Sequence, residues 1–465
     1  MKKYIAILLT LCFTAFAATA IEINCVAGRL VSTLNDKTID RLCIKGSVDA
    51  SDLFFIADEL ENLKELDLSG CTIEAYRGIP VHGQAHYEAA TIPGGTFAAS
   101  HIETIHFPTN GTLHIGDAAF ISSGLKSLNI SCNVTIGTGA FASCESLGDV
   151  RITGRAIIGE YAFRSCKSLS TADLTGAIEI GVKAFAACTQ LHTAVLGKDI
   201  SVIGASSFEG CGLKSIDLEN TIVNTIGNRA FAQNTSLENI LLPQSVKTLG
   251  EGLLSDCHAL GEFSIPPTCT SLPDYALKDT GIGHISLGNI VEIGAYSLKG
   301  NSSLSTITLP ATLERIGNNA MEGMTGLTSI EAAALKSVPS IGNDVWAGID
   351  RPAVLLLTAK DMVTQFRQSP QWQDFLILDE AQSSIKNTDV TKELSYTLHD
   401  DILAIESPES PITEVSVYSP DGKTAISARP SNRMCTLNLS GQSTRILIIH
   451  IILADSTVAN LKISR

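Results

Sequence analysis

The chain has 465 residues, with 33 Lys and Arg against 48 Asp and Glu, and a formal net charge of −15 at pH 7. Its 45% hydrophobic content excludes a mainly disordered chain, because disordered chains bury too little apolar surface to offset the entropy of ordering. The negative charge and the lack of Lys and Arg clusters argue against nucleic acid as a partner, since phosphate contacts need clustered positive side chains.

Residues 1–20 have the pattern of a signal peptide. Two lysines precede an apolar run over residues 4–18, and Ala18 and Ala20 occupy the two small positions that signal peptidase reads. The run is shorter than the roughly 20 apolar residues of a membrane span, which favours cleavage after Ala20 over an uncleaved anchor. We therefore expect an exported, acidic mature chain with no transmembrane segment.

Residues 21–91 precede the repeats, and we expect them to form an N-terminal cap followed by an insertion over residues 76–90. Four histidines lie in or near this insertion, at His82, His86, His101 and His106. A His-x-x-x-His pair binds metal readily only when a helix places both side chains on one face, and Gly83 interrupts this spacer. We therefore predict a solvent-facing loop and no metal site. Tyr87 in the insertion is a candidate for partner binding, because aromatic side chains often anchor interfaces.

A six-residue phrase, such as IGTGAF and IGEYAF, recurs twelve times over residues 92–349. Its copies begin at residues 92, 115, 136, 158, 180, 203, 226, 249, 272, 293, 316 and 341. The second residue is Gly in ten copies and Pro in two. A period this regular, 21 to 25 residues, predicts a solenoid in which each repeat is one coil. We expect the Gly to permit a tight bend and the large sixth residue, most often Phe, to enter the core.

A second motif, Leu-x-x-(Ile/Val/Ala)-x-(Leu/Ile), follows each phrase after a short polar segment. Leu147, Val150 and Ile152 are one example. The last two apolar residues are two positions apart, which places both side chains on one face of a strand. The motif therefore predicts a parallel β-sheet with one strand per coil and short helical or irregular segments between strands.

Together these motifs resemble the BspA-like class of leucine-rich repeat. The phrase IG-x-x-AF-x-x-C-x-x-L-x-x-I-x-LP is complete over residues 226–243, except that Asn234 replaces the Cys. The resemblance implies a leucine-rich repeat solenoid of about 12 coils, as in surface proteins of Gram-negative oral and gut anaerobes. It also implies an N-terminal cap over residues 22–68 and a closing strand and helix within a C-terminal cap, residues 350–379.

The C-terminal part has a different pattern. Residues 380–393 are polar and linker-like, and residues 394–465 contain short alternating runs, such as ITEVSVY and CTLNLS, that predict a small β-sandwich. The segment VSVYSPDGK followed by a final apolar strand resembles the sorting domain of the type IX secretion pathway, which implies transport to the outer surface. A plain structural or attachment domain is the alternative interpretation.

The cysteines form two groups. Five occupy one repeat position, at Cys144, Cys166, Cys188, Cys211 and Cys257. We interpret this column as small buried core residues, although stacked neighbours are close enough to oxidise in principle. In the N-terminal cap, a disulfide between Cys25 and Cys43 is as well supported as two free thiols. No C-x-x-C pair occurs, so the sequence indicates no structural zinc site.

No motif for catalysis is recognisable, whether G-x-S-x-G, a P-loop or an EF-hand loop. We therefore predict no enzymatic activity, no catalytic residues, no cofactor and no metal. The candidates for partner binding are outward-facing residues on or beside the predicted strands, where small polar and acidic side chains predominate. With Tyr87 they are Asp149, Arg151, Asp173, Asp217, Glu219, Glu262 and His284. Such a shallow, mildly negative surface would attract basic partners, or it is simply solvated.

We therefore predict an exported, non-enzymatic leucine-rich repeat protein, secreted by a Gram-negative bacterium or held on its outer surface. As the resemblance implies, its role is adhesion or host-macromolecule recognition, with an extracellular protein or glycoprotein as partner. One alternative is a structural envelope protein without a specific ligand. Another is an accessory glycan-binding module, which would need aromatic platforms that this sequence mostly lacks. The oligomeric state and the ligand's identity are not predicted.

Overall fold

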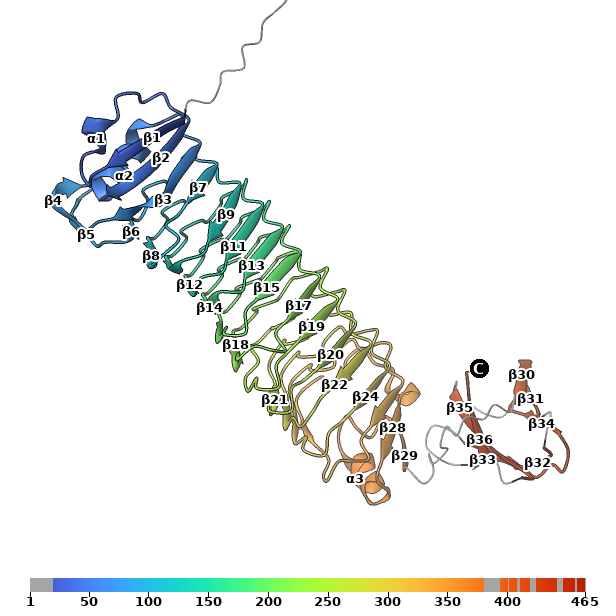
Figure 1. Cartoon of the computed structure of the whole chain (residues 1–465). Helices are drawn as coiled ribbons and strands as arrows, with labels where there is room; N and C mark the ends of the chain where they lie inside the picture. The colour runs from blue at the N-terminus through green and yellow to red at the C-terminus, as the bar shows by residue number, and fades with distance from the viewer. Residues whose placement is uncertain are drawn as a thin grey trace, which may run out of the picture. The chain divides into compact units, whose positions relative to one another are not determined.

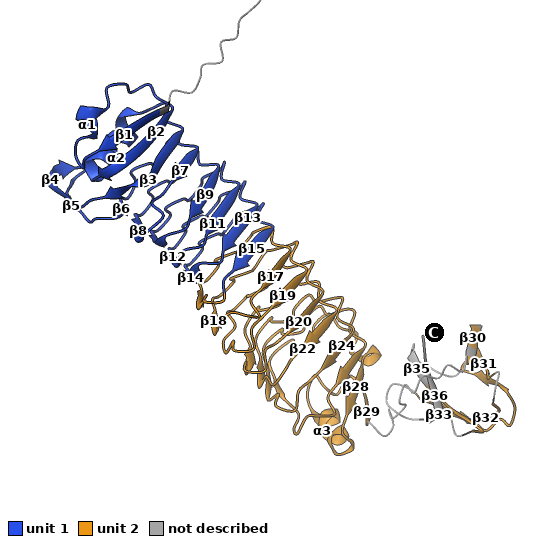
Figure 2. Cartoon of the chain, in the orientation of Figure 1, with its two compact units in different colours: residues 1–197 blue, residues 198–465 orange. Residues whose placement is uncertain are grey.

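The computed structural model describes residues 20–379, 394–399, 401–407, 410–418, 424–440, 446–455 and 458–464. The predicted signal peptide, apart from its last residue, and the predicted linker over residues 380–393 lie outside these ranges. The chain contains two compact units, Met1–Gly197 and Lys198–Arg465, which Figure 2 colours separately. Within each unit, short parallel strands stack in successive coils (Figure 1), so the predicted parallel β-solenoid is confirmed.

Unit 1 begins with a four-stranded parallel sheet and two helices. A buried carboxylate connects them, because Asp52 accepts hydrogen bonds from the backbone N–H of Gly28 at 2.7 Å, Leu30 at 2.9 Å and Asp49 at 3.1 Å. These bonds join the loop before the first helix to the start of the second. The elements are β1 (Ala20–Cys25), α1 (Leu30–Thr33), β2 (Arg41–Val48), α2 (Ala50–Glu59), β3 (Glu65–Ile73) and β7 (Thr104–His106).

The remaining coils of unit 1 contribute strands to two parallel sheets, which lie on different sides of the coils in Figure 1. One contains the predicted strands β9 (Ser127–Ile130), β11 (Asp149–Ile152), β13 (Thr171–Leu174) and β15 (Thr193–Leu196). In β11, Val150 and Ile152 are buried while Asp149 and Arg151 are exposed, as the spacing predicts. The other sheet, which the sequence analysis missed, ends at the first residue of each phrase. It contains β6 (Thr91–Ile92), β8 (Thr112–Ile115), β10 (Asn133–Ile136), β12 (Ala156–Ile158) and β14 (Ala177–Ile180).

The coils of unit 2 continue the same pattern with shorter strands. Among the strands that the second motif predicts, β17 (Ser215–Asp217) pairs with β19 (Asn239–Leu241), and β20 (Glu262–Ser264) pairs with β22 (His284–Ser286). At the phrases lie β16 (Val202–Ile203), β18 (Thr225–Ile226), β21 (Ser271–Leu272), β23 (Glu292–Ile293), β25 (Arg315–Ile316) and β27 (Ser340–Ile341). The last coils add β24 (Thr306–Thr308), β26 (Ser329–Glu331), β28 (Leu355–Thr358) and β29 (Leu376–Asp379).

Aromatic side chains close the C-terminal end of this stack. Trp346 lies with its ring centroid 5.0 Å from those of both Trp372 and Phe375, and Phe366 lies 5.2 Å from Trp372. All four side chains are buried. They cover the apolar end of the last coil, where the resemblance implies a closing strand and helix. The helical elements here are η1 (Arg351–Ala353), η2 (Lys360–Met362) and α3 (Val363–Gln368).

The sixth residues of the phrases form stacks of phenylalanine rings in the core. In unit 1 the centroids of Phe97, Phe120, Phe141, Phe163 and Phe185 follow one another at 5.2, 5.1, 5.2 and 4.9 Å. The last three pairs are within 9° of parallel. The prediction that this residue enters the core is confirmed, because all five rings are fully buried.

The second residue of the phrase lies where the backbones of consecutive coils approach most closely. A Cβ added at Gly159 would lie 2.5 Å from the carbonyl oxygen of Ile136, and one at Gly116 would lie 2.5 Å from the backbone nitrogen of Gly94. Positive φ values occur instead two residues later, as at Ala118 with 54°. The expected reason for this glycine, a tight bend, is therefore corrected: glycine provides room between coils, and the left-handed backbone lies at the fourth residue.

The cysteine column donates hydrogen bonds to backbone carbonyls of the preceding coil. Cys144 Sγ lies 3.1 Å from the carbonyl oxygen of Phe120, and Cys166 Sγ lies 3.2 Å from that of Phe141. Asn234, which replaces a Cys in the repeat, donates from Nδ2 to the carbonyls of Phe208 and Phe231, both at 2.8 Å. In these coils the position supplies a buried donor, as thiol or as amide, whereas the buried Met324 at the same position has no donor.

All eleven cysteines of the described residues are free thiols. Cys25 lies opposite Gly46 in the β1–β2 register, and Cys43 lies opposite Glu22. The two cysteines are therefore three residues apart along paired strands, which is too far for a disulfide. The open question of a bridge in the cap is answered in favour of two free thiols.

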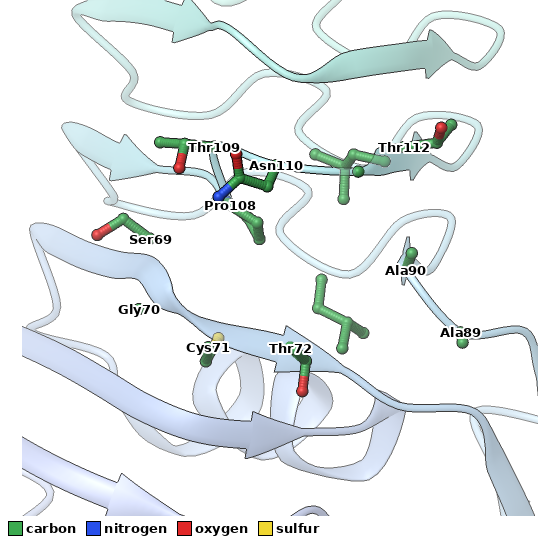
Figure 3. A pocket seen from close by; sticks show the side chains of 13 residues that line it. Ser69, Gly70, Cys71, Thr72, Ala89, Ala90, Pro108, Thr109, Asn110 and Thr112 are labelled. Atoms are coloured by element: carbon green, nitrogen blue, oxygen red, sulfur yellow. The ribbon is translucent and has the colours of Figure 1, made fainter.

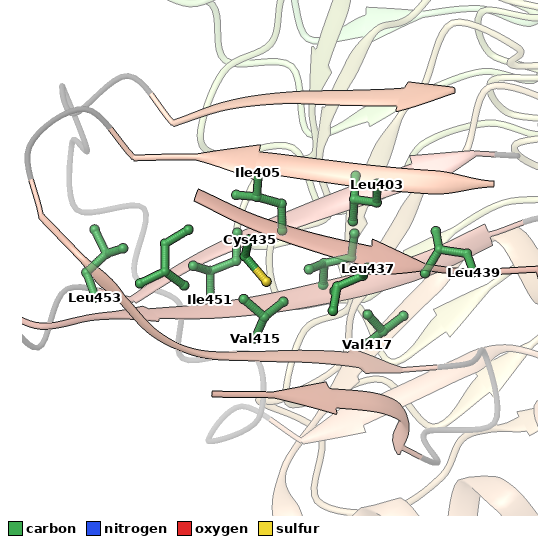
Figure 4. Close-up of a cluster of buried hydrophobic side chains, with 11 residues drawn as sticks. Leu403, Ile405, Val415, Val417, Cys435, Leu437, Leu439, Ile451 and Leu453 are labelled. Carbon is green, nitrogen blue, oxygen red and sulfur yellow. The ribbon is translucent and has the colours of Figure 1, made fainter. Parts of the chain in front are cut away.

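The C-terminal part of the chain contains two antiparallel sheets that share one apolar core (Figure 4), as predicted for a β-sandwich. One sheet contributes Leu403 and Cys435 to this core, and the other contributes Val415 and Ile451. The first sheet has β30 (Ser395–His399), β31 (Ile402–Glu406) and β34 (Met434–Asn438). The second has β32 (Ile412–Tyr418), β33 (Thr424–Ala428), β35 (Ile446–Leu453) and β36 (Val458–Ser464).

The close approach between coils predicts how two glycine substitutions differ. Gly159→Ala places a methyl group against the backbone of the preceding coil, and we expect it to lower the free energy of unfolding by about 1–3 kcal/mol. The matched control is Gly261→Ala, because an added Cβ there meets no atom within 4 Å. Guanidinium unfolding midpoints of both variants test this, and equal midpoints would contradict the assignment of Gly159 to coil spacing.

The donor role of the cysteine column predicts a second contrast at one position. Asn234→Ala leaves two buried carbonyls without their amide donor, and we expect it to lower the free energy of unfolding by about 1–3 kcal/mol. Asn234→Cys retains a donor of the kind that the neighbouring coils use, so it should lower the free energy of unfolding by clearly less than Asn234→Ala does. Chemical unfolding measures both, and a Cys variant as unstable as the Ala variant would refute the shared role.

Candidate functional site

The predicted binding residues of unit 1 lie on two different surfaces. Asp149, Arg151 and Asp173 are neighbours on the β11–β13 sheet, where Asp149 and Arg151 are exposed and Asp173 is half-buried. Arg151 Nε lies 3.5 Å from Asp173 Oδ2, so part of the expected negative charge is compensated. Tyr87 lies apart from them, on β5 (Gln84–Tyr87), next to the other sheet.

In unit 2 the predicted residues also fall into separate places. Asp217 ends β17, and its carboxylate accepts a hydrogen bond from the backbone N–H of Glu219 at 2.9 Å. Glu262 and His284 lie side by side in the β20–β22 register, and both are exposed. These side chains form a polar strand surface, and none of them lines a described groove.

The insertion over residues 76–90 is a β-hairpin, which corrects the expectation of an irregular loop. Its strands are β4 (Tyr76–Val81) and β5, joined by a two-residue turn at His82 and Gly83 with φ of 47° and 81°. Positive φ at both central residues is the geometry that twists correctly into a hairpin. The sequence analysis missed the turn because histidine replaces the Asn or Asp that usually precedes the Gly.

Aromatic contacts fix the hairpin on the cap. The His82 ring stacks on Phe54 with centroids 4.0 Å apart and planes 10° apart, and His82 Nε2 lies 3.0 Å from Asp58 Oδ2. Tyr87 lies 5.7 Å from Phe54, and its hydroxyl donates to the Val81 carbonyl at 2.9 Å. Of the four histidines, His82 therefore packs on Phe54 and bonds to Asp58, and His86 bonds to Glu88. In the described ranges, no three His, Cys, Asp or Glu side chains are grouped to hold a metal ion.

A groove of about 510 Å³ lies between this hairpin and the first coils of the solenoid. Within it, His86 Nε2 lies 2.7 Å from Glu88 Oε1, and this hydrogen bond holds the pKa of Glu88 below its ordinary value. The lining combines an aromatic ring, one carboxylate bonded to an imidazole, and neutral hydrogen-bonding groups. Its polar and aromatic side chains are Gln84, His86, Tyr87, Glu88, Thr91 and His114.

A second groove, of about 410 Å³, lies on the other side of the segment that leaves the hairpin. Figure 3 shows β3 on one side of it and the chain leading into β8 on the other. Its polar side chains are Ser69, Thr72, Thr109, Asn110 and Thr112, and none is charged. Cys71 lines the groove, but its thiol is buried and donates to the Leu68 carbonyl at 3.3 Å. Burial raises the pKa of Cys71 to about 12, so the thiol stays protonated at neutral pH and is a poor nucleophile.

The sequence analysis also missed two tyrosines, Tyr275 and Tyr296, which occupy the same phrase position in consecutive coils. Their rings stack with centroids 5.0 Å apart. An alignment of the phrases would have revealed them, because both tyrosines are the fourth residue of their phrase although aromatic residues are few in the chain. Over the ranges that the structure covers, no helix is long and apolar enough to cross a membrane.

A sequence profile described as BspA type leucine rich repeat region, in 6 copies, matches residues 84–192, 178–299 and 224–351. These matches span more than half of the chain and contain the twelve phrases. No curated protein matches the sequence.

Solved structures of other leucine-rich repeat proteins are similar to this chain at low sequence identity. A leucine-rich repeat protein from Bacteroides ovatus is 20% identical, with 72% of this chain and 83% of that chain covered and a TM-score of 0.49. A leucine rich cell surface protein from Faecalibacterium prausnitzii is 19% identical, with 57% and 87% covered and a TM-score of 0.30. The pneumococcal vaccine antigen PcpA is 16% identical, with 68% and 89% covered and a TM-score of 0.36.

The burial of the thiols predicts an order of chemical labelling. Cys43 is half-buried, while the other ten described cysteines are buried, so iodoacetamide should modify Cys43 first in the folded protein. Burial and the nearby Asp67 carboxylate raise the pKa of Cys43, so this reaction should be slow at pH 7 and accelerate as pH rises. Mass spectrometry of labelled peptides measures the order. Early labelling of Cys144 or Cys166 in the folded chain would contradict the buried column.

Proposed function

Because the chain belongs to the BspA-type leucine-rich repeat family, we propose that it is an exported, non-enzymatic binding protein that recognises an extracellular protein or glycoprotein. The solenoid of this family is typically a binding scaffold, since stacked coils present extended, rigid surfaces to partners. The hairpin β4–β5 and the groove beside it form the recognition site. The hairpin lies just before the first phrase at residue 92, where the chain departs from the coil pattern.

The observation that carries this proposal is an exposed apolar anchor beside a polar groove. Ile79 on β4 is 84% exposed, the highest value among the exposed large hydrophobic side chains of the described residues. Exposed apolar side chains that are held rigidly are typical anchors of protein interfaces. The hydroxyl of Tyr76 donates to the Ile79 carbonyl at 2.6 Å, which fixes the backbone that presents this side chain. The hydrogen-bonded side chains of His86 and Glu88 then supply directional contacts in the groove.

The strand surface supports the same function at longer range. Asp149, Asp217, Glu219 and Glu262 add negative charge to a chain whose net charge is −15. Such a field speeds the encounter with a basic partner and is weakened by salt. We assign these residues to attraction of the partner rather than to close contact, because they line no described groove.

Export and attachment complete the proposal. The signal-peptide pattern of residues 1–20 supports secretion, and the C-terminal β-sandwich supports sorting to, or attachment at, the outer surface of a Gram-negative bacterium. Adhesion to a host or neighbouring cell then follows from the display of the hairpin outside the cell.

Binding of the chain from residue 21 to immobilised extracellular-matrix proteins and mucins tests the proposed function. We expect saturable binding to one protein class, and a loss of about tenfold in affinity, close to 1.4 kcal/mol, for Ile79→Ser. The matched control is Val26→Ser, which removes a 68% exposed side chain elsewhere in unit 1. A comparable loss is expected for the double variant His86→Ala/Glu88→Ala.

Three results would contradict this function. Absence of saturable binding to any protein would favour a structural envelope role. Equal affinities for the Ile79 and Val26 variants would remove the hairpin from the site. Lys167 and Glu145 form an exposed ion pair elsewhere, with atoms 3.0 Å apart. If replacing this pair lowers the affinity as much as replacing His86 and Glu88 does, the effect is not specific to the groove.

A further inference from the structure

Two tyrosines in consecutive coils of unit 2 form a stacked pair at the surface. Tyr275 and Tyr296 follow strands β21 and β23, and their ring planes are 4° apart at a centroid distance of 5.0 Å. Tyr275 is 42% exposed, and Tyr296 is half-buried. In the described solenoid after Leu241, Tyr275 is the only exposed large hydrophobic residue among those described.

The backbone at these positions is unfavourable for a bulky residue. Tyr275 and Tyr296 have φ of 59° and 57°, the left-handed region in which glycine is unstrained and asparagine is tolerated. The same phrase position is Gly252 in the preceding coil and Asn319 in the following one. Other coils adopt the same φ at this position with residues other than glycine, as at Lys183 (54°) and Arg229 (57°), so this conformation belongs to the repeat. It does not itself require tyrosine, since glycine and asparagine fit it with less strain.

The surroundings of the pair are polar but electrically balanced. Lys278 is paired with Asp279 at 2.5 Å, and Lys299 is paired with Glu322 at 2.9 Å. The Lys299 ammonium also lies 5.4 Å from the centre of the Tyr296 ring. The rings are therefore bordered by hydrogen-bonding groups without a strong net charge, which suits a neutral ligand better than an ion.

One face of the Tyr275 ring is left without an equivalent neighbour. Tyr296 covers the face toward the next coil, whereas Gly252 occupies the matching position of the preceding coil and has no side chain. The atoms nearest to an added Cβ at Gly252 are Arg229 Cγ at 3.2 Å and Ser255 Oγ at 3.6 Å. Arg229 Nη1 lies 3.7 Å from the same point. The guanidinium is paired with Glu209 at 2.8 Å and donates to Ser255 Oγ at 3.4 Å, so the polar groups near Gly252 are held in place by their own hydrogen bonds.

We propose that Tyr275 and Tyr296 form a binding platform for a neutral sugar residue of a glycan. A pyranose ring has an apolar C–H face that stacks on an aromatic ring and hydroxyl groups that bond to a polar border. A protein partner fits this site less well, because no further exposed apolar residue surrounds the pair and a stable protein interface needs a much larger surface. The platform is independent of the function proposed for the hairpin.

The test compares two sets of tyrosine variants in the chain from residue 21. The probes are neutral oligosaccharides, namely maltoheptaose, cellohexaose, mannohexaose and galactohexaose, titrated calorimetrically. We expect binding of at least one probe and a loss of at least tenfold in affinity for Tyr275→Asn/Tyr296→Asn. The matched control is Tyr161→Asn, because Tyr161 has the same phrase position and a φ of 58°. This control should retain full affinity.

A stability measurement separates binding from a structural role. Because asparagine suits the left-handed backbone, the unfolding midpoint of Tyr275→Asn/Tyr296→Asn should not decrease. A decreased midpoint, unchanged affinity, or the absence of binding to all four probes would overturn the proposal. The proposal would also be overturned if the unaltered chain bound no sugar and the double tyrosine variant lost protein binding. The pair would then belong to a protein interface. Failure of the hairpin variants to alter protein binding would leave the platform unaffected.

Discussion

Where the second residue of the phrase is glycine, as at Gly116, Gly159 and Gly227, consecutive coils approach so closely that an added Cβ would collide with the backbone of the preceding coil. At Gly159 the carbonyl of the preceding coil lies 2.5 Å from where a Cβ would be. This contact brings the phenylalanines within stacking distance and places the cysteine or asparagine donors beside the carbonyls they bind. Regular core packing, buried hydrogen bonds and the outward strand surface all depend on this spacing between coils.

The two proposed binding regions use different departures from that regular pattern. At the hairpin, the chain leaves the coil altogether, and an anchor and a groove arise from inserted residues. At Tyr275 and Tyr296 the coil is intact, and only the side chain at one position differs from those of neighbouring coils. An insertion suits recognition of a large partner, while a substitution within the stack provides a small flat surface. The regular coils support both.

Much of the fold followed from the sequence, because a repeated phrase reports the same environment many times. The burial of Val150 and Ile152 came from their spacing, and the phenylalanine stack came from one recurring position. The second sheet did not, because the alternation visible in four-residue strands such as β8 and β10 is lost in coils whose strand has two residues, such as β16. The hairpin was missed because its turn has histidine in a left-handed conformation, and the tyrosine pair because a total count of aromatic residues hides where they lie in the repeat.

The left-handed fourth residue of the phrase has a consequence for how such a chain changes during evolution. It recurs once per coil, at Ala118, Tyr161, Tyr275 and Tyr296 among others, and always two residues after the position that touches the preceding coil. A duplication or deletion of one whole period keeps this phase, so every remaining coil retains its neighbours. A change in length inside the phrase would shift bulky residues to the close contact, whereas the segments between phrases already vary, since the coils here are 21 to 25 residues long. Large changes in the length of this solenoid are therefore expected to be whole coils, while single residues at the fourth position are free to change and create new ligand specificities.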